Sequence, residues 1–477
     1  MNTIPQTQHA VQLIGPDQLK INEQKQVFQP GPHQVLCRVE ACGLCFSDLK
    51  LLKQFSGHAR KSEVKAGIDQ KALLEMPHYV PGDKPVVPGH EAVVRIVKVG
   101  PQVTRFKVGE RYLVQTDYRW LPTTSSNAAF GYNFEGALQE YTLLDERVIT
   151  APDGESMLIP VPDDLSASAI ALCEPWACVE DAYVEKQRRT LRDGDVVYHG
   201  SDPAEVERLF ANVPTNGLMV ICQCGSRFGR PVVVPVGRTH YGGIRIVGTT
   251  GDKVEDALAS IPTTAEIRPN DRINIVGAAG PMGTMHVIRD LCQGVPGVTV
   301  FAGDLNEKRL ASLRELAQPL AARNKLTLRI YNPSKDRLVE KFNYIVLMAP
   351  VPALVAQAVK DAAANAIINI FAGIPADKTA EVDLDAYIEK QCYFIGTSGS
   401  TLDDMKAVLG KVKTRTLDTN LSVAAVAGLD GAIDGIRAIE NNTMPGKIIV
   451  YPSVKGLKLT PVQEWNAETE QALLRKT

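Results

Sequence analysis

The stretch RINIVGAAGPMGTMHVIRDLC, residues 272–292, combines the features that decide the fold of this chain. Arg272–Val276 is a short apolar run typical of a buried strand, and a glycine-rich turn and a helical pattern from Thr284 to Cys292 follow it. Such a unit places free backbone N–H groups at a helix N-terminus, where they bind the pyrophosphate of a dinucleotide. The residues expected to line this loop are Gly277, Ala278, Gly280, Pro281, Met282 and Gly283.

The loop reads Ala-x-Gly-x-x-Gly from Ala278, so it lacks the first glycine of GxGxxG and is weak evidence alone. Asp304 strengthens the interpretation, because it ends the next strand, where a carboxylate binds ribose hydroxyls and repels a 2′-phosphate. NAD is therefore favoured over NADP, although Arg309 nearby weakens that preference. Ala372, directly after a strand expected at 366–371, completes the expected cofactor site. The alternative is a glycine-rich turn without a ligand.

Strands and helices keep alternating after this loop, which predicts a doubly wound parallel sheet and hence an α/β fold over residues 186–424. The chain enters this region through a helix expected at Ser166–Arg192. Further strands are expected at 298–302, 344–348 and 393–396, with a helix at 350–364.

Residues 193–268 form an extra block, interpreted as an inserted partial αβ duplicate. The sequence at 191–197 resembles 267–273, and 244–252 resembles 392–400. Chance similarity between two αβ units is the alternative. The block has no glycine-rich phosphate loop, so we expect it to bind no dinucleotide.

Residues 1–185 and 425–477 are expected to form a β-rich domain. Short runs of branched residues such as 34–39 and 92–99 alternate with Gly and Pro, and β character returns at 446–451.

Composition limits the function classes. The net charge of −2 gives no bulk field for nucleic acid or an anionic membrane, and no apolar run reaches the length of a membrane span. The nine cysteines show no CxxC…CxxC arrangement, which indicates a reducing compartment without disulfides. A cytoplasmic location is therefore expected.

The segment 1–185 contains four candidate metal ligands: Cys45, His90, Glu91 and Glu174. A thiolate, an imidazole and a carboxylate are the ligand types that bind catalytic Zn²⁺ with one position left open. Taken singly, each residue has an ordinary structural explanation.

The segment that directly follows Cys45 contains three candidate catalytic residues. Ser47 offers a hydroxyl that could take a proton from a reacting alcohol, Asp48 could orient a metal ligand, and Lys50 could lie on the proton path.

The order of the motifs resembles the zinc-dependent medium-chain dehydrogenase/reductase family. The resemblance implies a GroES-like catalytic domain and a Rossmann domain, with zinc and nicotinamide between them, and it implies Cys45 and His90 as ligands and Ser47 as the proton relay. The motifs are Gly43-x-Cys45-x-Ser47-Asp48, Pro88-Gly89-His90-Glu91, Val108-Gly109-Glu110-Arg111, Glu174-Pro175, Gly280-Pro281-Met282-Gly283 with Asp304, and Gly446-Lys447-Ile448.

A glutamate at 174, where alcohol-specific members often have cysteine, resembles the polyol and sugar dehydrogenase branch. In that branch Glu91 or Glu174 completes the zinc shell with a water. The run from Gly280 to His286 is also similar to sorbose-1-phosphate reductase-like members.

Some features depart from the family. Residues 112–135 contain no cysteine, so no structural zinc lobe is expected and one catalytic zinc per subunit is predicted. Lys50 stands where a relay histidine is frequent. The extra segment at 57–85, between Cys45 and His90, could line the substrate site.

The sequence therefore predicts reversible hydride transfer between NAD and a secondary alcohol of a polyol or sugar, free or phosphorylated. Two alternatives stay open: a zinc-free NADPH-dependent alkene or quinone reductase of the same fold, and a non-catalytic nucleotide- or sugar-binding protein. The resemblance also implies a homodimer or homotetramer, joined through the strand at 393–396. The basic residues Lys50, Lys53, His58, Arg60 and Lys61 could meet a phosphate or form a solvated face.

Overall fold

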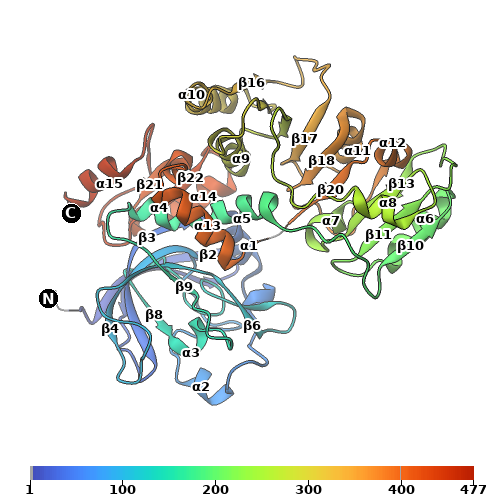
Figure 1. Cartoon of the computed structure of the whole chain (residues 1–477). Helices are drawn as coiled ribbons and strands as arrows, with labels where there is room; N and C mark the ends of the chain where they lie inside the picture. The colour runs from blue at the N-terminus through green and yellow to red at the C-terminus, as the bar shows by residue number, and fades with distance from the viewer. Residues whose placement is uncertain (1–3, 398, 477) are drawn as a thin grey trace. The chain divides into compact units, whose positions relative to one another are not determined.

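The computed structural model describes residues 4–397 and 399–476, which divide into two compact units. Unit 1 comprises Met1–Trp176 and Leu402–Thr477, and unit 2 comprises Ala177–Thr401 (Figure 1). The domain limits expected from the sequence, at 185 and 424, stay a prediction, because compactness alone does not define a folding unit.

Unit 1 is built on an eight-stranded sheet in the order β23-β21-β22-β3-β4-β5-β9, and β8 pairs with β3. Two separate hairpins, β1 (Thr7–Gly15) with β2 (Gln18–Gln26) and β6 (Asp117–Pro122) with β7 (Asn127–Ala129), accompany this sheet. The sheet strands are β3 (Gln34–Leu44), β4 (Glu91–Val99), β5 (Arg111–Val114), β8 (Tyr141–Asp145), β9 (Leu158–Pro160), β21 (Val423–Ala427), β22 (Lys447–Val450) and β23 (Thr460–Pro461).

Short helices complete unit 1, and residues from both segments of the chain bind each other there. Glu470, 3% exposed, accepts hydrogen bonds from the backbone N–H groups of Ala167 and Ser168 at 2.6 and 2.8 Å. Its carboxylate thus caps the helix that precedes Glu174. The helices are α1 (Phe46–Gln54), η1 (Phe55–Gly57), η2 (Ala59–Lys61), α2 (Gln70–Leu74), α3 (Glu146–Ile149), α4 (Ala167–Ala171), α13 (Leu402–Lys413), η4 (Thr419–Ser422), α14 (Leu429–Glu440) and α15 (Ala467–Leu474).

The helix expected at Ser166–Arg192 is shorter and divided. Ser166 caps α4 as its side chain accepts from the backbone of Ala169, and α5 (Cys173–Val184) follows. The predicted end was wrong because residues 185–192 have no continuous apolar face, and Arg188 instead pairs with Asp195 at 2.5 Å.

Unit 2 contains a six-stranded parallel sheet in the order β16-β15-β14-β17-β18-β20. Numbered along the chain, this is the order 3-2-1-4-5-6 of a doubly wound dinucleotide-binding fold, which confirms the predicted fold class. The strands are β14 (Arg272–Val276), β15 (Thr299–Gly303), β16 (Thr327–Tyr331), β17 (Phe342–Leu347), β18 (Ala362–Ile370) and β20 (Tyr393–Ile395), and the helices are α9 (Pro281–Cys292), α10 (Glu307–Arg323), α11 (Pro352–Asp361) and α12 (Leu384–Glu389).

The extra block forms a second parallel sheet, in the order β10-β11-β13. Its first strand and β14 start from turns of the same construction. Asp195 accepts from the backbone N–H of Arg192, and Asp271 accepts from that of Arg268, each at 2.8 Å. This shared turn supports the interpretation as a partial duplicate. The elements are β10 (Val196–His199), α6 (Pro203–Leu209), η3 (Phe210–Asn212), β11 (Leu218–Cys222), β12 (Val232–Val234), α7 (Gly237–Tyr241), β13 (Arg245–Thr249) and α8 (Val254–Ala259).

The block joins the larger sheet beside β20. The hydroxyl of Tyr387 donates to the carbonyl of Ile246 at 2.8 Å and accepts from the backbone N–H of Phe394 at 3.0 Å. One tyrosine therefore links β13 to β20. In addition, β12 pairs antiparallel with β19 (Ala380–Val382).

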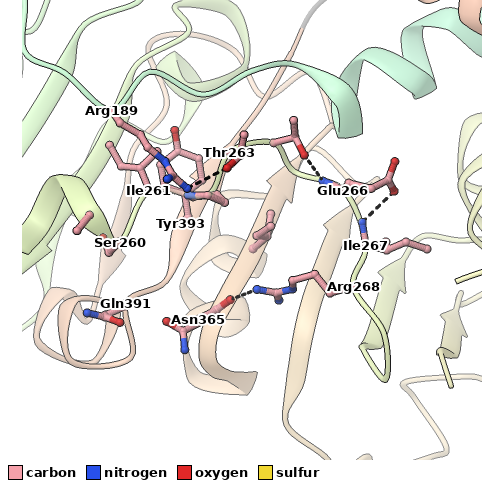
Figure 2. Close-up of a pocket in the computed structure, with 14 residues that line it drawn as sticks. Arg189, Ser260, Ile261, Thr263, Glu266, Ile267, Arg268, Asn365, Gln391 and Tyr393 are labelled. Atoms are coloured by element: carbon pink, nitrogen blue, oxygen red, sulfur yellow. Dashed lines mark hydrogen bonds between the residues drawn. The ribbon is translucent and has the colours of Figure 1, made fainter. Parts of the chain in front are cut away.

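A cavity of about 460 Å³ lies where the block meets the sheet (Figure 2). Its arginines bind the chain's own oxygens: Arg268 donates to the carbonyl of Asn365 at 3.0 Å, and Arg189 donates to the hydroxyl of Thr263 at 3.1 Å. Both side chains therefore have a structural role in this joint.

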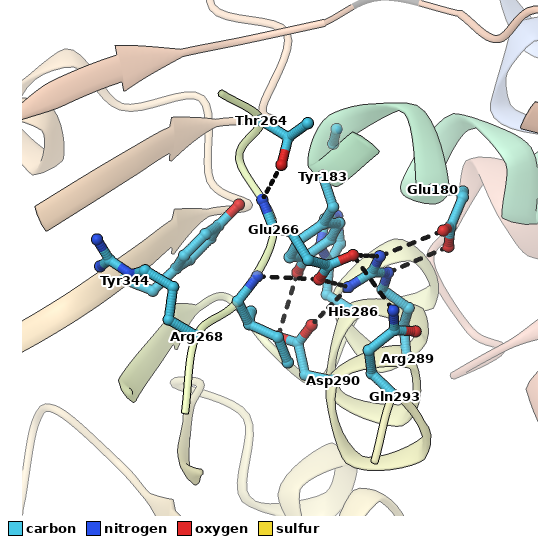
Figure 3. A network of polar contacts seen from close by, with 12 residues as sticks. Glu180, Tyr183, Thr264, Glu266, Arg268, His286, Arg289, Asp290, Gln293 and Tyr344 are labelled. Carbon is cyan, nitrogen blue, oxygen red and sulfur yellow. Dashed lines mark hydrogen bonds and ion pairs between the residues drawn. The ribbon is translucent and has the colours of Figure 1, made fainter. Parts of the chain in front are cut away.

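A buried polar network connects α5 to α9 (Figure 3). Arg289, 1% exposed, forms ion pairs with Glu180 at 3.2 Å and Glu266 at 2.7 Å. The hydroxyl of Tyr183 lies 2.8 Å from Nδ1 of His286 and donates to Asp290 at 3.2 Å. Burial raises the pKa of Asp290 to about 7.

Candidate functional site

The thiol of Cys45 lies at the junction of β3 and α1. β3 ends at Leu44, and Cys45 is the N-cap of α1. The backbone N–H of Cys45 donates to the carboxylate of Asp48 at 2.9 Å, which fixes the first turn of the helix. Sγ of Cys45 lies 3.1 Å from Oγ of Ser47, so the predicted relay hydroxyl is next to the predicted ligand.

His90 and Glu91 lie where the chain enters β4. Gly89 has φ +94, a conformation that favours glycine, and turns the chain so that the next two side chains point inward. His90 is 5% and Glu91 0% exposed. Nδ1 of His90 lies 3.4 Å from Asp48, which is the orienting position proposed for that carboxylate.

The structure brings three of the four candidate ligands into one group. Among the residues that the structure describes, one ligand atom each of Cys45, His90 and Glu91 lie within 4.8 Å of one another. Burial opposes protonation of His90, but Tyr132, Asp48 and Cys45 outweigh it and raise its pKa well above the usual value. The group therefore attracts a cation.

Glu174 lies in the first turn of α5, close enough to interact with this group. Burial is the main cause that raises the pKa of Glu174 to about 7; Glu91 acts in the same direction, and His90 and Lys447 act against it. A carboxyl group in this position gains from a nearby cation.

Lys447 is a residue of the site that sequence reasoning did not assign. Its ammonium donates to Glu91 at 2.5 Å and to the carbonyl of Leu44 at 2.7 Å. Burial lowers the pKa of Lys447, but Glu91 and Cys45 outweigh that effect and raise it above the usual value. The motif Gly446-Lys447-Ile448 was recognised, but no sequence signal indicated the contact with Glu91.

The donor set fits a divalent cation such as Zn²⁺. Oε2 of Glu91 is buried without a hydrogen-bond partner, so the group has unused ligand capacity. A thiolate, an imidazole and a carboxylate match the chemistry that zinc prefers.

Tyr132 lies beside this group, and Lys50 follows Ser47 on α1. The ring of Tyr132 is buried, and its centroid is 5.7 Å from that of His90, a contact that no sequence pattern indicated. Lys50 lies on α1 three residues after Ser47, on the same face of the helix, and is exposed.

The dinucleotide loop in unit 2 has the predicted form. Gly277 has φ +85, Gly280 is the N-cap of α9, and Pro281 begins the helix, three residues earlier than expected. A Cβ on Gly283 would lie 2.4 Å from the carbonyl oxygen of Gly277, whereas a Cβ on Gly280 would meet its nearest atom at 4.0 Å. Gly283 thus allows close packing of helix and strand, and Gly280 leaves open space at the helix N-terminus. Met282 lies in the first turn of α9.

The other expected cofactor residues lie around this loop. Asp304 accepts from the backbone N–H of Ala279 at 3.1 Å and from that of Asn306 at 3.0 Å. The backbone of Arg309 donates to the side chain of Asn306, at the start of α10. The backbone N–H of Ala372 donates to Leu347 at 2.8 Å, beyond the carboxyl ends of β17 and β18, where ligands bind in such sheets.

Comparison with protein families identifies the segment that carries the candidate metal ligands. Residues 31–153 match the family model of the alcohol dehydrogenase GroES-like domain. Cys45, His90 and Glu91 all lie in the matched segment.

Two bacterial relatives cover most of the chain. A protein of Escherichia coli K12 named YggP is 25% identical over 413 residues, which are 83% of this chain and 79% of that protein. L-sorbose 1-phosphate reductase of Klebsiella pneumoniae is 22% identical over 443 residues, 90% of this chain and 85% of the reductase.

Among solved structures, 2R,3R-butanediol dehydrogenase of Bacillus subtilis has a TM-score of 0.60 with 18% identity and covers 94% of this chain and 100% of its own. Within residues 4–397 and 399–476, every helix is too short or too polar to cross a lipid bilayer.

Proposed function

Since the chain belongs to the medium-chain dehydrogenase/reductase family, as an oxidoreductase of the alcohol dehydrogenase type, we propose that it is a zinc- and NAD-dependent enzyme that interconverts a secondary alcohol and a ketone of a polyol or sugar. The observation that carries the proposal is the buried group of Cys45, His90 and Glu91. Zinc-free reductases of this fold have no need of such a group.

Cys45, His90 and Glu91 would hold the metal. Glu91 is the better third ligand because its carboxylate shares the group with the thiol and the imidazole, and its second oxygen already neutralises Lys447. Glu174, close by, supplies a further carboxylate that would orient a bound hydroxyl or water. A Zn²⁺ ion bound here would lower the pKa of a substrate hydroxyl and polarise a ketone.

Ser47 would take the proton of the substrate hydroxyl. Its Oγ lies 3.1 Å from Sγ of Cys45, so a hydroxyl that reacts beside the thiolate is within hydrogen-bond reach of Ser47. Lys50, exposed on the same face of α1, would pass the proton to solvent. Asp48 would keep His90 oriented.

The loop at 277–283 would hold the dinucleotide pyrophosphate at the N-terminus of α9. Asp304 would bind the ribose hydroxyls and select NAD over NADP, while Arg309 and Ala372 would contact the cofactor from neighbouring loops. The nicotinamide would accept or return the hydride.

The catalytic domain would comprise 1–185 and 425–477, and the NAD-binding domain 186–424 with its inserted block at 193–268. We propose a homodimer or homotetramer in the cytoplasm, with one zinc per subunit. Nine free cysteines support a reducing compartment.

Replacing the thiol tests the proposal. Cys45→Ser should lose most bound zinc and reduce oxidation of a polyol panel with NAD⁺ by more than about 100-fold, because the thiolate is both ligand and charge. Cys224→Ser, which changes an exposed thiol in unit 2, should keep metal and activity. Full activity of Cys45→Ser without metal, measured by elemental analysis, would overturn the proposal.

A further inference from the structure

Five basic residues follow Cys45 along the chain, and the structure removes two of them from any role in binding an anion. Lys53 pairs with Asp17 at 2.7 Å and with Glu440 at 2.5 Å. Lys61 is fully buried, and its ammonium donates to two backbone carbonyls. Both side chains are therefore committed to the fold.

Two of the other three, His58 and Arg60, lie beside the ring of Tyr132. The ring of His58 lies 5.1 Å from it, and Cζ of Arg60 lies 5.5 Å from its centroid. Burial, together with the charges of Arg60 and Lys50, lowers the pKa of His58 to about 4. Both cations thus lie near the same imidazole.

Tyr132 also connects this basic group to the proposed metal site, because its ring centroid lies 5.7 Å from that of His90. A substrate whose hydroxyl reacts beside His90 would therefore place a group several bonds away next to Arg60.

The basic group is only partly neutralised, and it is held in place. Asp117 pairs with Arg60 at 2.6 Å, whereas Lys50, whose charge acts on the same imidazole as that of Arg60, is not part of this pair. The turn that carries Arg60 is fixed by Thr123, whose hydroxyl donates to the carbonyl of Ala59 at 3.2 Å. A fixed, net positive group of this kind binds an anion without a large ordering cost.

We propose that Arg60, His58 and Lys50 form a subsite for the phosphate monoester of a phosphorylated sugar or polyol. The inference rests on the proposed function, since it names the substrate class of the same site. A dianion matches the excess positive charge better than a carboxylate does, and a guanidinium donates two parallel hydrogen bonds to phosphate.

Binding of inorganic phosphate tests the subsite without turnover. In calorimetric titration of the zinc-loaded protein saturated with NAD⁺, Arg60→Gln should weaken phosphate binding about tenfold or more, because charge-assisted hydrogen bonds are lost. Asp117→Asn should strengthen binding, since it removes the opposing charge. Lys53→Gln is the matched control and should leave it unchanged. Equal affinity in all four proteins would overturn the subsite, and Arg60→Lys, which keeps the charge, separates loss of binding from loss of folding.

Reduction by NADH of D-fructose 1-phosphate, D-fructose and the monocarboxylate 5-keto-D-gluconate separates the subsite from the reaction. The subsite predicts that Arg60→Gln lowers kcat/KM for the phosphate ester at least tenfold more than for the free sugar. Equal losses for ester and carboxylate would overturn the choice of a phosphate. If no substrate reacts but phosphate binding depends on Arg60, the proposed function fails and the subsite stands. If the free sugar reacts and Arg60→Gln changes neither phosphate binding nor kcat/KM, the subsite fails and the proposed function stands.

Discussion

At the scale of single residues, the charge balance of the metal site depends on Glu91 and Lys447. Glu91 is fully buried, and the ammonium of Lys447 is the cation bonded to it. A buried carboxylate that loses its partner keeps the full cost of its desolvation, whereas removal of both charges together costs little.

Lys447→Met should therefore destabilise the metal-free protein by about 3 to 5 kcal/mol. Added zinc should restore part of this loss, because the metal supplies the missing positive charge. The double variant with Glu91→Gln should recover stability in the metal-free state, as followed by chemical denaturation. An unchanged midpoint in Lys447→Met would contradict the structural role of this pair.

Ser47 allows a second test at this scale. Ser47→Ala removes the hydroxyl 3.1 Å from the Cys45 thiol without removing a metal ligand. We expect kcat to fall about 100-fold with zinc content unchanged, because general acid–base catalysis contributes factors of this size. Steady-state kinetics combined with metal analysis checks this. Ser56→Ala, at an exposed position just beyond α1, is a suitable control.

At the scale of elements, the contact between β14 and α9 shapes the loop. Two of the three glycines of the loop have different tasks: a methyl group on Gly283 would collide with the backbone of Gly277, and one on Gly280 would enter open space.

Gly283→Ala should therefore lower stability by about 1 to 3 kcal/mol, the usual cost of overpacking, and disturb the loop as well. Gly280→Ala should fold normally but weaken binding of NADH, because the methyl group occupies the space at the helix N-terminus. Thermal denaturation and fluorescence titration with NADH distinguish the two effects. Equal stability of both variants would contradict this division.

The elements also show what could be predicted from the sequence. Strand β14 was predicted to the residue, since an apolar run between a turn and a glycine loop is a local signal. The helix expected at 350–364 instead ends at Asp361, because Ala362 already belongs to β18 and local helix propensity gave way to sheet pairing.

Contacts between distant residues could not be predicted in this way. Cys45 and His90 were found from motifs, but Lys447 reaches Glu91 across 356 residues of sequence, and periodicity carries no information on such a pairing. Tyr132 was missed for the same reason: an isolated tyrosine in an irregular segment has no pattern. The link that Tyr387 forms between β13 and β20 depends on the tertiary fold as well.

At the scale of the whole molecule, the buried network around Arg289 links the pH of the solution to the stability of unit 2. The pKa of Asp290 is raised by burial from 3.8 to about 7, so the folded protein keeps this proton where the unfolded chain releases it. Between these values, a rising pH therefore lowers the free energy of unfolding. His286 acts in the opposite direction, because burial and Arg289 lower its pKa from 6.5 to about 3.

Asp290→Asn should remove the pH dependence that comes from Asp290 and leave the one that comes from His286. The stability of this variant relative to the unmodified protein should rise from about pH 4 to pH 7 and then level off. Denaturation in urea across pH 4.5 to 8 measures the difference, with Asp377→Asn, an exposed position of unit 2, as the control. A difference that does not depend on pH would contradict the ionisation assigned to Asp290.

The division of unit 1 into two chain segments has a consequence for biosynthesis. Leu44 receives its hydrogen bond from Lys447, which is translated 403 residues later. At ribosomal speed this delay lasts roughly 20 to 80 s. During that interval all of unit 2 is translated, while β3 lacks its neighbour β22 and α4, once made, lacks the carboxylate of Glu470. The nascent chain therefore exposes an unpaired strand edge on the ribosome, and chaperones that shield such edges should raise the yield of folded protein.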